Sequence, residues 1–389
     1  TGLVLPRENT STTFENLDDP VWIAWLNWRR RAVGDFWVAF RRAVNAVNPQ
    51  FCNMKYTTHS GFTTNWAIRE FGADLIDNAR TCDFLGTEIM SRNVYDSARA
   101  VFAHRKLKSA LGDLYGLPVW GLVYHVDDPV FAYVGWAMNH MNRQTTWMST
   151  IEGEDMKRYV DWPERMDCRR AAPVADVAVL FSAHSRDFAR MFSPSADPLG
   201  VSECLTDAHV QHDFILDQDL LDKGKLHRYK LVVLASTGCL SRRQVETLRA
   251  YVAEGGALLV TTNASLLDER GFVQPNFQLA DVLGVDYDPA GTVRGPLTWR
   301  DRADAATVAF PGAALRVKPR QGATIQADFV NAKGEPVWPA AVANRCGRGK
   351  SLYLPVAIGA ANYESEARAG GKATFAKDKD LARRFIRLV

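Results

Sequence analysis

The sequence predicts an α/β protein with parallel strands in two successive parts. In the first part, strand and helix signals alternate about every 30 residues, which is typical of parallel strands joined by crossover helices. In the second part, strands such as Ala257–Thr261 are apolar at consecutive positions, as strands covered on both faces are. Nine of the eleven tryptophans lie between Trp22 and Trp162, so the two parts also differ in composition. We place their boundary near residue 168, in a polar and proline-flanked segment.

Composition excludes several classes of protein. The chain has 389 residues, of which 47% are hydrophobic and 23% charged, so it is neither disordered nor fibrous. A net charge of +3 is small for this length and argues against a nucleic-acid partner. No apolar run approaches the roughly 18 residues that span a bilayer, so we expect no membrane partner. We expect a soluble protein whose compartment, cytoplasmic or secreted, is left open.

The first part begins with a long amphipathic helix. Asp19 is a suitable N-cap with Pro20 at the first helical position, and apolar residues at spacings of three and four continue to Val47. The pair Asn48-Pro49 ends the helix. Beyond it we expect strands over 51–56, 83–89, 118–125 and 145–148, and helices over 71–78, 94–114 and 130–141.

The second part alternates in the same way and then becomes richer in strands. Ser241 caps a helix over 244–254, and Gly255-Gly256 terminates it. The segment 296–349 is more β-rich, with turns at Lys333-Gly334 and 347–349. We further expect strands over 174–181, 214–216, 229–234, 257–261 and 351–356, and helices over 199–209 and 378–389.

The second part resembles a known domain. The order of segments 174–181, 229–234, the helix leading into 255–260, and 349–354 is similar to that of the trimerisation domain of family 42 glycoside hydrolases, the β-galactosidase type. The resemblance covers about residues 172–389. It implies a flavodoxin-like, doubly wound domain with a class I glutamine-amidotransferase-like fold. It also implies a homo-oligomer, possibly a trimer.

The first part then resembles the barrel that precedes this domain in those enzymes. The segments 37–49, 51–56 and 83–88 are similar to later units of a (β/α)8 TIM-type barrel. We therefore divide the chain into residues 1–167, the C-terminal portion of a glycosidase-like barrel, and residues 168–389, the trimerisation domain. A complete barrel needs about 250 residues, so only part of one is expected in the first 167.

Two departures from the family pattern bear on function. The general acid of the pattern belongs to the half of the barrel that is not visible, and the strand Val119–His125, which would carry the nucleophile, has no carboxylate. Retaining hydrolysis needs two carboxyl groups about 5 Å apart. The resemblance implies a glycoside hydrolase acting on a carbohydrate through carboxylate chemistry. The alternatives are a non-catalytic carbohydrate-binding pseudoenzyme and an oligomeric scaffold.

The catalytic candidates are Glu88, His125 and Asp127. Glu88 follows an apolar strand, and a barrel places its chemistry at the carboxyl ends of its strands. Its role would be acid/base catalysis or binding of a substrate hydroxyl, and the alternative is a structural ion pair with Arg92. His125 and Asp127 follow the next strand. The alternative for them is a polar loop in which Asp128 caps the following helix.

The substrate-binding candidates carry amide, ammonium, guanidinium, imidazole or aromatic groups that suit sugars. Asn53 and Lys55 share one side of a strand, because alternate residues do. Aromatic faces such as that of Trp120 can stack on sugar rings, whereas tryptophans at helical spacing, such as Trp22 and Trp37, are expected to pack in the core. The predicted set is Asn53, Lys55, Tyr56, His59, Arg92, Trp120 and Tyr124.

Two further chemistries are weighed and set aside. Cys239 follows a strand, as the amidotransferase nucleophile does, but all eight histidines precede residue 228, so no downstream base would activate it. His209 and His212 have a spacing that suits a metal, but the end of a surface helix is the preferred account of them. Six cysteines without a CxxC pair argue against a structural zinc site. We expect no metal and no cofactor.

Overall fold

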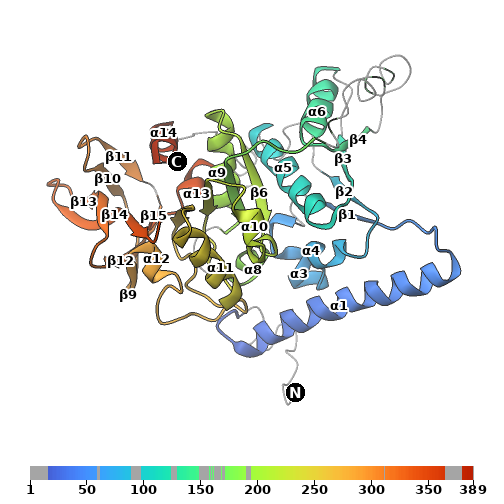
Figure 1. Cartoon of the computed structure of the whole chain (residues 1–389), viewed down its shortest axis with the longest axis horizontal. Helices are drawn as coiled ribbons and strands as arrows, with labels where there is room; N and C mark the ends of the chain where they lie inside the picture. The colour runs from blue at the N-terminus through green and yellow to red at the C-terminus, as the bar shows by residue number, and fades with distance from the viewer. Residues whose placement is uncertain are drawn as a thin grey trace. The chain divides into compact units, whose positions relative to one another are not determined.

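The computed structural model describes residues 16–58, 62–88, 98–123, 129–148, 157, 159, 161, 168, 171–189, 194–310, 312–363 and 379–388. The chain divides into two compact units, one within Thr1–Pro173 and the other within Val174–Glu364 together with the C-terminal segment. Each unit is of mixed α/β type with parallel strands, which confirms the predicted class (Figure 1). Among the described residues, no helix is both long enough and apolar enough to cross a bilayer.

The first unit contains a four-stranded sheet in the order β1-β2-β3-β4. All three neighbouring pairs are parallel, so successive strands are joined by crossovers that carry helices. The strands are β1 (Met54–Thr58), β2 (Phe84–Glu88), β3 (Val119–Val123) and β4 (Thr145–Met148). The helices are α1 (Pro20–Val47), α3 (Trp66–Phe71), α4 (Leu75–Ala79), α5 (Ala98–Tyr115) and α6 (Pro129–Met141).

Helix α1 has the ends that the sequence predicts. The Asp19 carboxylate accepts a hydrogen bond from the Val21 N–H at 2.8 Å, and Pro20 occupies the first turn, where no N–H is needed. Asn48 ends the helix in an extended conformation. The single helix expected over 71–78 is wrong: α3 and α4 are separate because Gly72 adopts φ 67°, a left-handed conformation that terminates α3.

Helices α5 and α6 cover one face of this sheet. Gly121 of β3 lies beneath them, where Arg105 Nη2 donates to the Leu122 carbonyl at 2.8 Å and Asn139 Nδ2 donates to the Gly121 carbonyl at 2.9 Å. A Cβ at position 121 would overlap both the Arg105 guanidinium and the Asn139 amide. Only glycine therefore permits this close approach of helices to strand.

We expect Gly121→Ala to destabilise the protein by about 3 kcal/mol, because it overpacks a buried site and displaces two buried hydrogen-bonding side chains. Urea unfolding of the variant measures this loss. Gly224→Ala is the matched control. Gly224 lies in the first turn of α10, and a Cβ added there would meet only the carboxylate of Asp222 at 3.2 Å. Equal midpoints for the two variants would contradict the packing described for Gly121.

The second unit is built on a nine-stranded sheet in the order β11-β10-β13-β14-β15-β8-β7-β5-β6. Its five strands β6, β5, β7, β8 and β15 are mutually parallel, and β10, β11, β13 and β14 continue the sheet in antiparallel pairs. The strands are β5 (Val177–Phe181), β6 (His212–Leu216), β7 (Leu231–Leu234), β8 (Ala257–Thr261), β10 (Leu297–Asp301), β11 (Thr307–Phe310), β13 (Thr324–Val330), β14 (Pro336–Cys346) and β15 (Gly349–Leu354).

A separate pair of strands, β9 (Val285–Val293) and β12 (Ala314–Pro319), forms a two-stranded antiparallel sheet. The predicted β-rich character of 296–349 is confirmed, and β14 and β15 meet in a tight turn at Gly347, where φ is 59°. The helices are α8 (Ala183–Phe188), α9 (Ala196–Asp207), η2 (Asp219–Leu221), α10 (Lys223–Leu226), α11 (Arg242–Ala253), α12 (Ala280–Leu283), α13 (Ile358–Asn362) and α14 (Lys379–Leu388).

Helix α11 shows how local sequence sets an element. Ser241 and Gln244 form a capping box: the Ser241 N–H donates to Gln244 Oε1 at 2.8 Å, and the Gln244 N–H donates to Ser241 Oγ at 3.4 Å. The helix ends as predicted, with Gly255 at φ 117°. Its buried residues, which include Val245, Leu248 and Val252, pack toward the sheet.

Asp197 holds several segments of the second unit together. Its buried carboxylate accepts hydrogen bonds from Ser236 Oγ at 2.7 Å and Thr261 Oγ1 at 2.6 Å. Ser236 follows the carboxyl end of β7, and Thr261 is the last residue of β8. It also accepts from the Gly359 and Ala360 N–H groups of α13, at 2.8 and 3.1 Å. Burial raises the pKa of Asp197, and these four donors oppose that shift.

Candidate functional site

The register of the first sheet places Glu88 in a row of positions at its carboxyl end. Glu88 is paired with Thr58 of β1 and with Leu122 of β3, and Leu122 is paired with Trp147 of β4. Paired positions of neighbouring strands belong to the same face of a sheet. Glu88 and Trp147 therefore share a face, with Leu122 between them.

An aromatic surface lies one row before Glu88 on the same face. Here Gly86 is paired with Trp120, and Trp120 with Thr145. The Trp120 side chain is 38% exposed, and its ring centroid lies 4.7 Å from that of Phe84. Two residues along a strand span about 7 Å, so the Trp120 ring is within reach of a sugar whose hydroxyl or glycosidic oxygen contacts Glu88.

The opposite face of the sheet is the one that the helices cover. Gly121 contacts Arg105 and Asn139. Val123 packs against Ala132 of α6, and its side chain lies so close to Gly135 of α6 that a Cβ there would overlap it. Glu88 and Trp120 have the other parity and face away from these helices. In a closed barrel of β/α units the face turned away from the helices is the interior, and chemistry occurs at the carboxyl ends of the strands.

Glu88 is partly exposed at the end of β2. Within the described part of the chain, no hydrogen bond or ion pair holds its carboxylate. Arg92, the partner considered for it in a structural ion pair, lies outside the described residues, so that alternative stays a prediction. A partly exposed carboxylate on the same face as an exposed indole ring, one row away, is suited to exchange a proton with a bound sugar or to accept hydrogen bonds from its hydroxyls.

Asn53 lies at the other end of the sheet from Glu88. It precedes β1, where its N–H donates to Asp83 Oδ2 at 2.7 Å and its Nδ2 donates to the Thr81 carbonyl at 3.2 Å. Asp83 is in turn held by the Arg41 guanidinium through two 2.6 Å hydrogen bonds, which lower the pKa of Asp83. The structure thus places Asn53 in a polar cluster that anchors α1 to the amino edge of the sheet.

Lys55 belongs to the face that carries the helices. It is paired with Leu85, and its Nζ lies 2.7 Å from the centroid of the Trp37 ring of α1. Burial lowers the pKa of Lys55 to about 8. Because strand parity separates it from Glu88, the structure does not bring the two predicted site residues together.

The depressed pKa of Lys55 predicts a pH dependence of stability. Between pH 8 and 10.5 the unfolded chain holds the Lys55 proton and the folded chain has released it. Because the unfolded chain binds more protons in this range, Lys55 makes the free energy of unfolding increase as the pH rises. We expect Lys55→Met to remove this rise while keeping the contact with Trp37. Urea unfolding at pH 8 and pH 10 measures it, and identical pH slopes for the two proteins would contradict the burial of the ammonium.

The remaining predicted residues are placed only in part. Tyr56 is paired with Gly86, so it has the parity of Glu88, but its side chain is not described. Five predicted site residues lie outside the described residues and stay predictions: His59, Arg92, Tyr124, His125 and Asp127. Of the tryptophans expected to pack, Trp22 is buried at 2% exposure, and Trp37 contacts Lys55.

Sequence reasoning missed the contribution of β4. Thr145 and Trp147 alternate on this strand and have the parity of Trp120 and Leu122, to which they are paired. Trp147 is 45% exposed. The signal was present as an alternating Thr-Thr-Trp-Met strand, but only the register of β3 with β4 shows that these side chains belong to the face of Glu88.

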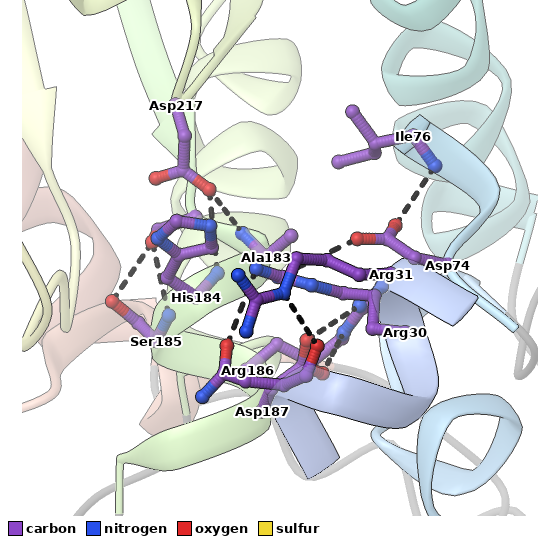
Figure 2. Close-up of polar contacts among 12 residues, drawn as sticks. Arg30, Arg31, Asp74, Ile76, Ala183, His184, Ser185, Arg186, Asp187 and Asp217 are labelled. Carbon is purple, nitrogen blue, oxygen red and sulfur yellow. Dashed lines mark hydrogen bonds and ion pairs between the residues drawn. The ribbon is translucent and has the colours of Figure 1, made fainter. Parts of the chain in front are cut away.

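The carboxyl edge of the sheet in the second unit is the other place where a parallel sheet could hold a ligand. The Asp217 carboxylate accepts hydrogen bonds from the Ala183 and His184 N–H groups at 2.8 and 3.3 Å (Figure 2). The Cys239 N–H donates to Ser185 Oγ at 3.0 Å, and the thiol is buried with its pKa raised well above the ordinary value. This edge is packed with its own polar side chains, and Cys239 is not poised as a thiolate nucleophile.

His212, one of the two histidines at metal-like spacing, is also used within the fold. Its Nε2 lies 2.7 Å from Ser202 Oγ, and its Nδ1 lies 3.0 Å from the Val210 carbonyl. Both ring nitrogens therefore contact groups of the protein, and the ring is 2% exposed.

Comparison with known proteins shows which folds the chain is similar to. Residues 175–366 match the family model of the β-galactosidase trimerisation domain. Over 99% of its length the chain superposes on a catalytic mutant of Gan42B, a family 42 β-galactosidase from G. stearothermophilus, with a TM-score of 0.70 and 13% identity. The cold-adapted β-galactosidase from Rahnella sp. R3 gives a TM-score of 0.69 and 14% identity over 100% of the chain.

The same architecture occurs in an exo-β-1,4-mannosidase from Opitutaceae bacterium strain TAV5, with a TM-score of 0.64 and 14% identity over 92% of this chain and 70% of the mannosidase. The chain spans 59% and 61% of the lengths of the two β-galactosidases. Its fold is therefore similar to that of these glycoside hydrolases. The matched domain lies almost entirely in the second unit, and through it the chain resembles the family 42 glycoside hydrolases.

Proposed function

We propose that this protein is a β-galactosidase-like glycoside hydrolase in which Glu88 supplies acid/base chemistry to a bound carbohydrate. The observation that carries the proposal is the position of Glu88: it stands at the carboxyl end of a parallel β/α sheet, on the face turned away from the helices and one row from the exposed Trp120 ring. A protonated Glu88 would donate its proton to the leaving oxygen as the glycosidic bond breaks through an oxocarbenium-like transition state, and a water would supply the hydroxyl that replaces that oxygen at the anomeric carbon and release its other proton.

The fold supports two further assignments. We assign residues 1–167 to the later portion of a (β/α)8 barrel and residues 168–389 to a flavodoxin-like, class I glutamine-amidotransferase-like domain. The parallel order β6-β5-β7-β8-β15 supports the second, because numbering these strands along the chain gives 2-1-3-4-5, the flavodoxin-like order. The family name of the second unit supports a homo-oligomer, possibly a trimer.

Hydrolysis needs a partner for Glu88. Two carboxyl groups must flank the scissile bond, about 5 Å apart for retention and about 6.5–9.5 Å apart for inversion. Strand β3 is the neighbour of β2, and its Leu122 is paired with Glu88. The sequence of β3 is Val-Trp-Gly-Leu-Val, which has no carboxylate. Asp127 and His125, which follow β3 in sequence, remain the proposed partners on this chain for orienting the sugar or the catalytic group.

Aryl glycosides test the proposal directly. Release of nitrophenol from a β-galactoside, compared with the α-galactoside and the β-mannoside, would establish hydrolysis and its preferred sugar. Quenching of tryptophan fluorescence by galactose without turnover would instead identify the protein as a carbohydrate-binding pseudoenzyme, which the missing carboxylate of β3 favours. If the protein neither binds nor hydrolyses a sugar, the hydrolase and the carbohydrate-binding hypotheses are both excluded, and the oligomeric scaffold is left.

A further inference from the structure

We propose that Cys52 and Cys82 form a reversible disulfide when the protein meets a peroxide. The bond would join the chain segments that lead into β1 and β2, at the end of the sheet opposite Glu88. It would close a loop that contains α3 and α4. Neither cysteine belongs to the candidate carbohydrate site, so this proposal is independent of the proposed function.

The register of the sheet places the two cysteines at matching positions. Each pair of residues that β1 and β2 form, beginning with Met54 and Phe84, is separated by 30 positions in the chain. Cys52 and Cys82 have the same separation and lie two positions before that first pair. Neighbouring strands lie about 4.8 Å apart, and the Cα atoms of a disulfide are about 4.4–6.8 Å apart. Positions in this register are therefore close enough to be bridged.

Hydrogen bonds hold the two segments together directly before the strands begin. The Asp83 N–H donates to the Asn53 carbonyl at 2.9 Å, and the Asn53 N–H donates to Asp83 Oδ2 at 2.7 Å. Asn53 Nδ2 also donates to the Thr81 carbonyl at 3.2 Å. The residue that follows one cysteine is thus bonded to the residue that follows the other. The disulfide therefore requires rotation of the two side chains and little movement of the backbone.

A shared cation lies near both thiols. The Arg41 guanidinium is fixed by two 2.6 Å hydrogen bonds to the Asp83 carboxylate and by a 2.9 Å hydrogen bond to the Thr81 carbonyl. The hydrogen bond to Asp83 is the main reason why the pKa of Arg41 is raised, and the nearby sulfurs of the two cysteines raise it further. A positive charge held near a thiol favours the thiolate, which is the form that reacts with peroxides.

The two thiols differ in exposure, which assigns them different parts in the reaction. Cys52 is exposed to solvent. Cys82 is 7% exposed, and its Sγ donates a weak hydrogen bond to the Asn78 carbonyl at 3.4 Å. Burial raises the pKa of the Cys82 thiol, and the nearby cations Lys55 and Arg41 oppose that rise. Cys52 is therefore the thiol that meets the oxidant, and Cys82 is the thiol that resolves the product.

The reaction consumes one molecule of hydrogen peroxide and releases two molecules of water. The Cys52 thiolate attacks one peroxide oxygen, the O–O bond breaks, and the departing hydroxide takes up the proton that the thiol released. The product is a sulfenic acid on Cys52. The Cys82 sulfur then attacks the Cys52 sulfur, the S–O bond breaks, and the second hydroxide takes up the Cys82 proton. The two sulfurs together lose the two electrons that reduce the peroxide.

Peptide mapping after mild oxidation tests the proposal. The 389-residue chain is treated with hydrogen peroxide, alkylated under denaturing conditions and digested with pepsin at low pH, where disulfides do not exchange. We expect a peptide in which Cys52 is linked to Cys82, with an intact mass lower by about 2 Da, and dithiothreitol should reverse both changes. A link from Cys52 to any other cysteine, a link between two chains, or oxidation of Cys52 to a sulfinic acid without a link would overturn the proposal. An unmodified Cys52, under conditions that oxidise a free cysteine peptide, would overturn it as well.

Matched variants separate this pair from general oxidation of thiols. In Cys52→Ser, buried Cys82 should lose its thiol at least about ten-fold more slowly than in the wild type, because it then meets the oxidant directly. Cys346→Ser is the control, since Cys346 is partly exposed and ends β14 in the second unit, and this variant should form the link at the wild-type rate. Equal loss of the Cys82 thiol in the wild type and in Cys52→Ser would contradict the proposal.

Discussion

Replacement of Glu88 by Gln is expected to reduce glycoside hydrolysis by about 10²- to 10⁴-fold while leaving the melting temperature of the protein unchanged. The amide keeps the shape of the side chain but cannot give or take the proton, and removal of a general acid or base costs a factor of this size. Stability should be insensitive because Glu88 is partly exposed and no described group pairs with its carboxylate. The initial rate on an aryl glycoside and a thermal melt are the two measurements.

Glu70→Gln is the matched control for this variant. Glu70 belongs to the same unit, is exposed, and forms a 3.5 Å ion pair with its neighbour Arg69 on α3. The control should retain full activity, since an exposed pair of this kind contributes little to stability and nothing to the site. A Glu88→Gln protein that unfolds at a clearly lower temperature would show that Glu88 is structural, as the ion pair with Arg92 implies.

Asp197→Ala is expected to give the largest loss of stability in the second unit, about 3–5 kcal/mol. The substitution leaves two buried hydroxyls, those of Ser236 and Thr261, and two N–H groups of α13 without their acceptor. Removal of one partner from a buried charged network typically has a cost of this size. Chemical denaturation followed by circular dichroism measures it.

The close packing around Asp197 sharpens this expectation. Gly200 of α9 and Gly359 of α13 approach so closely that a Cβ on either would overlap backbone of the other helix, so the two helices are already in backbone contact next to Asp197. Asp304→Ala, at an exposed carboxylate that pairs with Arg387 at 3.7 Å, provides the control and should stay within about 0.5 kcal/mol of the wild type. A similar midpoint for the two variants would contradict the role of Asp197.

Much of the fold follows from local sequence. The ends of α1 and α11 are set by Asp19-Pro20 and by Ser241 with Gln244, and the apolar run 257–261 became β8 as expected. Short elements were harder. Helix α8 has only six residues, so its sequence shows no detectable helical periodicity. Its start depends on the Ser182 side chain, which accepts a hydrogen bond from the Ser185 N–H at 3.0 Å.

The site was predictable only as far as single strands allow. The position of Glu88 follows from the end of an apolar strand, and the structure places it there. The prediction that Asn53 and Lys55 belong to the same site as Glu88 is not supported by the structure. Asn53 precedes β1, which begins at Met54, and the pairing of β1 with β2 places Lys55 on the face that the helices cover. Register between distant strands is a tertiary property, so the contribution of Thr145 and Trp147 could not be seen in the sequence of β4 alone.

The most direct test of the central claim, that a sugar binds on the face of Glu88, is a titration of the protein with indole-labelled tryptophans by nuclear magnetic resonance. Methyl β-galactoside is the ligand, and Trp120→Phe and Trp147→Phe variants assign the two signals. We predict saturable shifts of the Trp120 and Trp147 indole resonances while those of buried Trp22 and Trp299 stay fixed. Saturable shifts confined to other tryptophans, or none at all, would contradict the claim and place any carbohydrate site elsewhere.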